Sequence, residues 1–283
     1  MKRIIIIGFL ALWGFVLVNL VGCAPVKQVN AGDSTLVMVA APAASLDIAV
    51  TGPACAAPTP EMIAGCQAQA ERILASTVRL EFHGPGDIGH ATVIGGRYLI
   101  THNHYSVSGE ALSRGGDGLV SAVSVLKANG NVILLNAPLS YFSVVLIAPE
   151  VLVLDFREYS GVGFFDSLGV PSAEIGVWGS FNVQPGSEVA QIDWDGTTAR
   201  VVWVRVASVH PEGDAPTIEL DSFVEHGASG GGVFYNGFHI ANNWSRKTDQ
   251  NAQTGEILRK SSLAVLNTPA IALNAPTLTS SGD

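Results

Sequence analysis

Short segments in which apolar and polar residues alternate dominate the chain from residue 77 onward. Apolar side chains at positions 78, 80 and 82 alternate with polar ones at 79, 81 and 83, which is typical of a half-buried β-strand. The segments 91–94 and 98–101 flank Gly95-Gly96-Arg97 and predict a hairpin. Further short strands are expected at 132–135, 144–147, 151–154, 189–192, 200–209, 218–220, 232–235, 238–242 and 258–265. Because these segments do not alternate with long helices, the pattern predicts an all-β barrel or sandwich and excludes a doubly wound α/β fold.

The composition narrows the class of protein further. The chain has 283 residues, and 15 Lys and Arg against 24 Asp and Glu give a formal net charge of −9. A protein that binds nucleic acid needs a basic face, so this balance argues against a nucleic-acid partner. Hydrophobic residues make up 48% and charged residues 14%, which excludes a disordered chain. The length allows one large domain or two small ones packed as a unit.

The N-terminus has the arrangement of a secretory signal, because Lys2 and Arg3 precede an apolar run at 4–18. The run leads into Leu20-Val21-Gly22-Cys23, which resembles the lipobox of bacterial lipoproteins, in which the cysteine is acylated and becomes the mature N-terminus. The resemblance implies lipidation at Cys23 and an extracytoplasmic protein anchored by lipid to a membrane of a bacterial cell envelope. A plain signal peptide or an N-terminal anchor helix are the alternatives. After this run, no segment has the 18 uninterrupted apolar residues of a membrane span.

The layout of the chain follows from its composition and its turn signals. Thr59-Pro60-Glu61 predicts a helix start, and Ile63, Cys66, Ala70 and Ile73 then fall on one helical face. We expect a lipoprotein signal peptide at 1–22, an Ala- and Pro-rich tether at 23–58, a short helix at 59–76, the β domain at 77–268 and a loose C-terminal tail at 269–283.

Two cysteines remain if Cys23 is lipidated. In an oxidising compartment Cys55 and Cys66 are expected to form a disulfide, which would stabilise the fold by about 3 kcal/mol. Two unpaired thiols are the alternative. A metal site is not expected, because the chain has no Cys-x-x-Cys spacing.

Two segments have the residue types of acyl-transfer chemistry. One runs from Arg97 to His104, at the end of a predicted hairpin strand, and the other is Gly227-Ala228-Ser229-Gly230-Gly231. A serine between glycines lets the backbone turn sharply and aim two N–H groups at one point, which stabilises the oxyanion of acyl transfer. The hydroxyl is a poor nucleophile unless a histidine lies within hydrogen-bond reach.

Both segments resemble the signatures of chymotrypsin/trypsin-like serine peptidases, above all the bacterial secreted branch. The likeness covers residues 77–265, and its first motif selects His104 as the general base over His102. The resemblance implies a serine endopeptidase with two antiparallel β-barrels, its site in the cleft between them, a polypeptide substrate and no cofactor. Ser229 would be the nucleophile, and the N–H groups of Gly227 and Ser229 would form the oxyanion hole.

Serine peptidases of this family use a triad of serine, histidine and an acid, and the sequence leaves two candidates for the acid. The family places an acid just ahead of an apolar strand, and here Glu150 precedes the run 151–154 while Asp155 follows it. Side chains five positions apart on a regular strand point to opposite faces, so only one of the two can face His104. Glu150 is the expected acid, and Asp155 or an acid elsewhere are the alternatives.

Some positions depart from the family pattern. Ala228 stands where an aspartate pairs with the new N-terminus of the animal digestive enzymes, so activation by that route is not expected. Phe223 holds the usual position at the base of the specificity pocket, with its far wall expected at 241–244. The other histidines, at positions 83, 90, 210, 226 and 239, are expected on the surface or on strand faces. A catalytically weak or inactive trypsin-fold lipoprotein that binds without cutting is the competing hypothesis.

Overall fold

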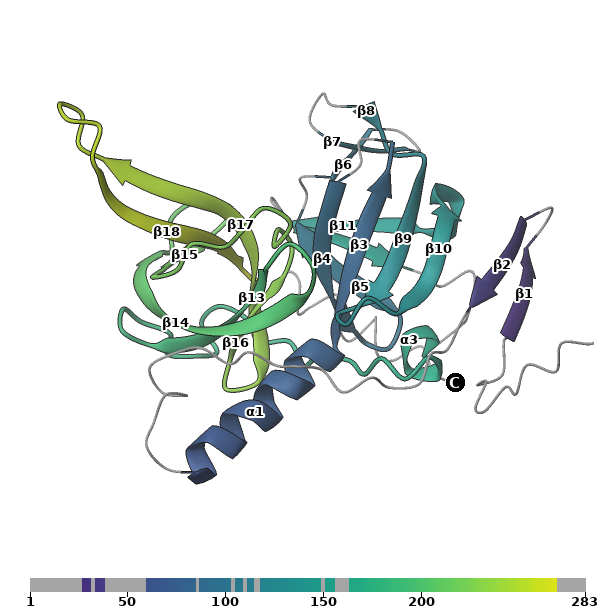
Figure 1. Ribbon diagram of the computed structural model, residues 1–283, viewed down its shortest axis with the longest axis horizontal. Coiled ribbons are helices and arrows are strands. Elements are labelled where there is room, and N and C mark those ends of the chain that lie inside the picture. Colours follow the sequence, from purple (N-terminus) through teal and green to yellow (C-terminus); the bar gives the residue numbers. More distant parts are fainter. Residues whose placement is uncertain are drawn as a thin grey trace, which may run out of the picture.

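The computed structural model describes residues 27–31, 34–38, 60–84, 87–102, 105–108, 111–114, 118–148, 151–155 and 163–268. Two units built from β-strands lie side by side, with the helix at 60–75 below them (Figure 1). The prediction of an all-β fold is therefore confirmed. Both units use antiparallel pairing between the strands of their sheets.

The first unit is a seven-stranded sheet with the order β10-β9-β3-β4-β5-β12-β11. Ile133 of β10 and Leu152 of β12 belong to one apolar core although their strands are far apart in the sheet, so the sheet curls around that core. The strands are β3 (Thr77–His83), β4 (Asp87–Ile94), β5 (Tyr98–His102), β9 (Ala122–Lys127), β10 (Val132–Pro138), β11 (Ser143–Ala148) and β12 (Val151–Asp155).

The second unit is a closed barrel with the order β13-β14-β15-β18-β17-β16. Alternate residues such as Val189, Val206 and Ile218 fill its interior, because successive side chains of a strand point to opposite faces. The strands are β13 (Glu188–Trp194), β14 (Ala199–His210), β15 (Thr217–Leu220), β16 (Gly232–Tyr235), β17 (Phe238–Gln250) and β18 (Ile257–Leu266).

Helix α1 (Pro60–Ala75) connects the two units, because it contacts β3 of the sheet and β14 of the barrel. Ala70, Ile73 and Leu74 are buried in a core that also contains Ile192 of the barrel. The apolar face expected from the sequence is buried only in the second half of the helix, since Ile63 is 42% exposed.

The smaller elements are not strands of the seven-stranded sheet or of the closed barrel. Two strands, β1 (Lys27–Ala31) and β2 (Ser34–Met38), pair within the segment expected to be a tether. A small sheet is formed by β6 (Tyr105–Ser108), β7 (Ala111–Arg114) and β8 (Gly118–Leu119), and the short helices are η1 (Leu139–Tyr141) and α3 (Phe164–Ser167). No helix in the described part of the chain is long and apolar enough to cross a membrane. The predicted signal peptide and the C-terminal tail lie outside the described residues.

Candidate active site

The glycine turn around Ser229 lies between β15 and β16, on the side of the barrel that meets the sheet. Gly227 and Gly230 have φ angles of +104° and +77°, in the left-handed region that glycine adopts without steric cost. Ala228 donates to the Glu225 carbonyl at 3.1 Å, and Gly231 donates to the Ala228 carbonyl at 3.0 Å. The sequence therefore forms a compact turn here, and the Ser229 side chain remains partly exposed at its apex.

This turn is packed directly against the first unit. The His90 N–H of β4 donates to the Ser229 carbonyl at 2.8 Å. A side chain at Gly230 would collide with the Thr101 hydroxyl and the His90 carbonyl, and it would lie 3.1 Å from the backbone nitrogen of His102. Only glycine lets the turn approach the end of β5 this closely.

Replacing Gly230 with alanine is expected to push the Ser229 turn away from β5. A collision with backbone atoms cannot be relieved by a rotamer change, so we expect a loss of stability of about 2–4 kcal/mol and activity at least about tenfold lower. Gly237→Ala is the matched control, because Gly237 has a φ of +87° but no atom within 4 Å of the added carbon. Thermal unfolding and active-site labelling measure the two effects. Equal losses in both variants would contradict the close packing of Gly230.

His90 fixes the glycine turn from the opposite unit. Its Nδ1 lies 2.8 Å from the Gly227 carbonyl, and because a carbonyl only accepts, Nδ1 carries the proton. Burial lowers the pKa of His90 to about 4, against the raising effect of the Gly227 bond, and nearby Arg79 lowers it further. His90 is therefore neutral at pH 7, and its ring lies 5.3 Å from that of Trp194.

Of the histidines expected on the surface or on strand faces, His90 of β4 and His239 of β17 lie on strands and are fully buried. His90 and His239 have no exposed area, and desolvation lowers the pKa of each to about 4. The sequence contained one signal for His90, because the segment 89–94 around it has no charged side chain. A strand of this kind is buried on both faces, here where the sheet meets the barrel.

A buried polar network supports the turn from inside the barrel. The Asn243 amide donates to the Ile192 carbonyl at 2.6 Å and to the Ala228 carbonyl at 3.2 Å. Gln191 donates to Asn243 at 2.8 Å and to Ser262 at 3.0 Å. Because buried amides without partners are costly, this network specifies one position for the chain beneath Ser229.

Two N–H groups of the turn have no acceptor among the described residues. Ala228, Gly230 and Gly231 all donate to backbone carbonyls, whereas the N–H groups of Gly227 and Ser229 donate to no described group. These are the two groups that the resemblance to chymotrypsin/trypsin-like peptidases assigns to an oxyanion hole.

A cavity of about 250 Å³ opens beside Ser229. Glu225 and Arg246 approach each other at its rim, 4.0 Å apart and both well exposed. The Glu225 N–H donates to buried Asp193 at 3.0 Å, which fixes this wall to β13. Phe223, expected at the pocket base, lines a neighbouring cavity instead. The lining residues are Val224, Glu225, His226, Ser229, Asn243, Trp244, Ser245 and Arg246.

Of the remaining predicted site residues, Asp155 lies within the part of the chain that the structure describes. His104 and Glu150 lie outside the described residues. Asp155 is buried, and its carboxylate lies 3.5 Å from the Arg97 guanidinium. In the pairing of β12 with β5, Asp155 is opposite Tyr98 whereas Val151 is opposite His102, so Asp155 is at the far end of the strand pair from His102.

The cysteines are described only in part. Cys66 is disulfide-bonded, while its expected partner Cys55 and the expected lipidation site Cys23 lie outside the described residues. The Cys55–Cys66 pairing therefore stays a prediction.

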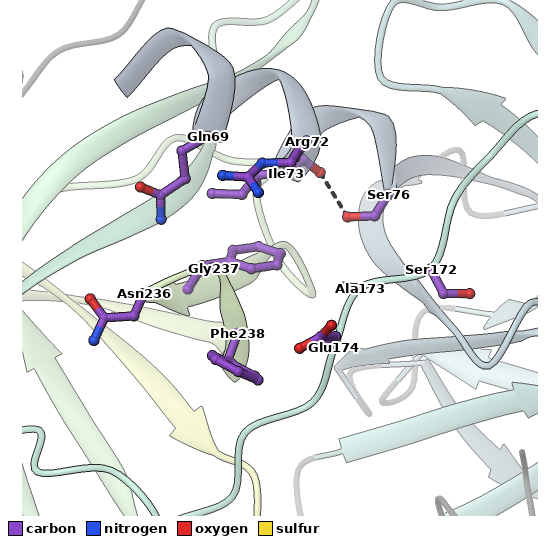
Figure 2. A pocket seen from close by; sticks show the side chains of 11 residues that line it. Gln69, Arg72, Ile73, Ser76, Ser172, Ala173, Glu174, Asn236, Gly237 and Phe238 are labelled. Atoms are coloured by element: carbon purple, nitrogen blue, oxygen red, sulfur yellow. Dashed lines mark hydrogen bonds between the residues drawn. The ribbon is translucent and has the colours of Figure 1, made fainter. Parts of the chain in front are cut away.

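A second cavity, of about 220 Å³, shares no lining residue with the one beside Ser229. Figure 2 shows α1 along one side, with Gln69 and Arg72, and the β16–β17 turn and the segment around Glu174 on the others. The Ser76 hydroxyl donates to the Ile73 carbonyl at 3.0 Å and closes the last turn of the helix. This cavity lies where α1, the connection between the units and the barrel meet.

The chain is similar to solved serine proteases in fold, at low sequence identity. The thermostable serine protease AL20 from an extremophilic microorganism superposes with a TM-score of 0.52 and 12% identity, over 75% of this chain and 100% of that one. The inactive form of the Rv3671c protease superposes with a TM-score of 0.49 and 13% identity, over 83% of this chain and 100% of that one. The inactive form of a serine-to-alanine mutant of Rv3671c from M. tuberculosis H37Rv superposes with a TM-score of 0.46 and 15% identity, over 81% of this chain and 97% of that one.

AL20 is similar to this chain in fold. No protein-family model matches the chain. No curated protein matches it either. The closed barrel, the curled sheet and the superposition on AL20 agree with one another. The chain therefore has the fold of the trypsin-like serine proteases.

Proposed function

We propose that the protein is a serine endopeptidase that hydrolyses peptide bonds through an acyl-enzyme. The observation that carries this proposal is the packing of the Ser229 turn onto the end of β5. Gly230 touches Thr101 and lies against His102, and His104 is two residues further along the chain. A nucleophile and a histidine within reach of each other are what acyl transfer by serine requires.

The same strand end supports Glu150 as the orienting acid. Val151 and His102 are partners in the β5–β12 pair, and Glu150 directly precedes Val151. Asp155 is already engaged by Arg97 at the other end of the pair. We therefore keep Glu150 as the residue that holds the His104 imidazole and stabilises its cation.

The reaction follows from these roles. The Ser229 oxygen attacks the scissile carbonyl carbon while His104 takes the hydroxyl proton, and negative charge moves to the carbonyl oxygen. The N–H groups of Gly227 and Ser229 donate to that oxygen. His104 then gives its proton to the leaving amine, the C–N bond breaks, and water hydrolyses the acyl-enzyme by the same steps in reverse. His90 keeps Gly227 in place during both steps.

Labelling with a fluorophosphonate probe tests the proposed function directly. The probe phosphonylates only a serine activated by a base, so we expect one adduct per chain, located at Ser229 by peptide mass spectrometry. Heat-unfolded protein is the control and should not react. A folded protein without an adduct would instead support the competing hypothesis of a trypsin-fold binding module.

Lipid anchoring is proposed from the sequence of the N-terminus. Mass spectrometry of the mature chain is expected to show an acylated Cys23 as the first residue, because a lipobox directs both acylation and cleavage at its cysteine. Cys23→Ser should release the protein from membranes or stall its processing. A mature chain that begins elsewhere would refute the anchor while leaving the proposed chemistry intact.

A further inference from the structure

The β17–β18 hairpin continues outward from the cavity beside Ser229 and projects well beyond the barrel (Figure 1). β17 pairs with β16 only up to Asn242 but with β18 up to Gln250, so beyond Asn242 its other edge pairs with no described strand. The Gly230 N–H donates to the Asn243 carbonyl at 2.9 Å, which puts the Ser229 turn at the start of this edge. An extended chain that reaches Ser229 can therefore continue along β17.

One face of the hairpin has its charges satisfied by the protein itself. Lys247 and Arg259 lie 3.5 and 3.2 Å from the carboxylate of Glu219, which is 5% exposed. The Ser261 hydroxyl donates to the same carboxylate at 2.8 Å. Burial alone would raise the pKa of Glu219, but the Ser261 bond and the two cations hold it below its usual value. Lys247 also lies 3.7 Å from the carboxylate of Asp249, so the two cations on this face are balanced by two acids of the protein itself.

The opposite face presents two cations with little to neutralise them. Strand register puts Arg246 and Lys260 on this face, and both lie over the ring of Phe223, at 5.3 and 4.9 Å from its centre. Arg246 is 41% exposed, and the acid near it is Glu225, 4.0 Å away and 57% exposed. Lys260 forms no ion pair with any described residue. An aromatic face holds cations in place without cancelling their charge.

We propose that this face of the hairpin binds an acidic segment of the polypeptide substrate, with carboxylates beside Arg246 and Lys260 and the substrate backbone along the free edge of β17. Charge complementarity selects an acidic occupant. The chain as a whole has a net charge of −9, whereas this face is basic and attracts anionic groups. The free edge of β17 selects a polypeptide among polyanions, because only a polypeptide backbone can pair with it as a further strand. The inference rests on the proposed function only in calling the occupant a substrate.

Peptide binding to the Ser229→Ala variant tests the proposal separately from catalysis. An otherwise neutral peptide is made in versions that carry a pair of Glu, Gln or Lys residues, and the pair is moved along the peptide one position at a time. Each version is labelled with fluorescein, and its anisotropy gives Kd. At low salt we expect the best Glu peptide to bind about three- to tenfold more tightly than its Gln counterpart, a difference that shrinks in high salt. Equal Kd values for the Glu and Gln peptides at every position would overturn the proposal.

Paired variants assign the effect to this face. Arg246→Gln with Lys260→Gln should remove the preference for Glu, whereas Arg205→Gln, an exposed cation elsewhere on the barrel, should retain it. Persistence of the preference in the double variant would overturn the proposal. So would binding to phosphatidylglycerol vesicles without any preference among the peptides, since Ile257 and Leu258 are also exposed on this hairpin.

Cleavage of the same peptides by the wild-type protein provides the second readout. We expect the preference for Glu to appear in kcat/KM at the positions where it appears in binding. Binding with this preference but without any cleavage would contradict the proposed peptidase and support the acidic-segment site. Cleavage at equal kcat/KM for the Glu, Gln and Lys peptides would support the proposed peptidase and contradict the acidic-segment site.

Discussion

Ser229→Ala is expected to abolish both probe labelling and peptide hydrolysis, with residual turnover lower by about 10⁴-fold or more. The change removes the only atom proposed to attack the substrate and leaves the rest of the turn unchanged. The Ser229 contact with β4 uses its carbonyl, which alanine also has. Thermal stability should therefore stay within about 0.5 kcal/mol of the wild type.

The control for this variant is Ser187→Ala, which removes a hydroxyl in a turn of the same barrel that accepts the Gln184 N–H. That variant should label and hydrolyse normally. Labelling that persists in Ser229→Ala would show that another side chain is the nucleophile. Loss of activity together with unfolding would show that the serine has a structural role that the contacts do not reveal.

Glu150→Gln is expected to lower turnover by about 10²–10⁴-fold with little change in substrate binding. The amide keeps the size of the side chain but loses the charge that, in the proposed mechanism, stabilises the imidazolium of His104. Steady-state kinetics with one peptide substrate should show the loss in kcat, with KM nearly constant.

Asp155→Asn is the matched control, because it makes the same change at the alternative acid. Its carboxylate faces buried Arg97, so the variant should lose stability by unpairing a buried cation while the folded fraction keeps its turnover. A greater loss of kcat in Asp155→Asn than in Glu150→Gln would assign the orienting role to Asp155.

Local patterns predicted most of the strands. Residues 78–82, 91–94 and 98–101 fall within β3, β4 and β5, and each strand expected in the second half lies within or overlaps an observed one. Alternation of apolar and polar residues is a local property, and burial on one face of a sheet enforces it. The glycine turn at 227–231 is also a local pattern, because the positive φ angles at Gly227 and Gly230 favour glycine at these positions.

Tertiary contacts decided the features that the sequence did not reveal. β17 was expected to end at Asn242 but continues to Gln250, through residues that are largely polar. Its register with β18 and the ion pairs to Glu219 maintain it as a strand without an apolar face. The role of His90 depends on Gly227, 137 positions away, and no pattern within β4 indicates that partner.

The packing of Gly230 onto β5 makes the site a property of the assembled molecule and of neither half by itself. The barrel contributes Ser229 and the two N–H groups proposed to bind the oxyanion, and the sheet contributes His90 and the strand that leads to His104. A newly synthesised chain therefore has no competent site until both halves have folded and docked. For the proposed peptidase, such an arrangement would delay activity to the last step of folding.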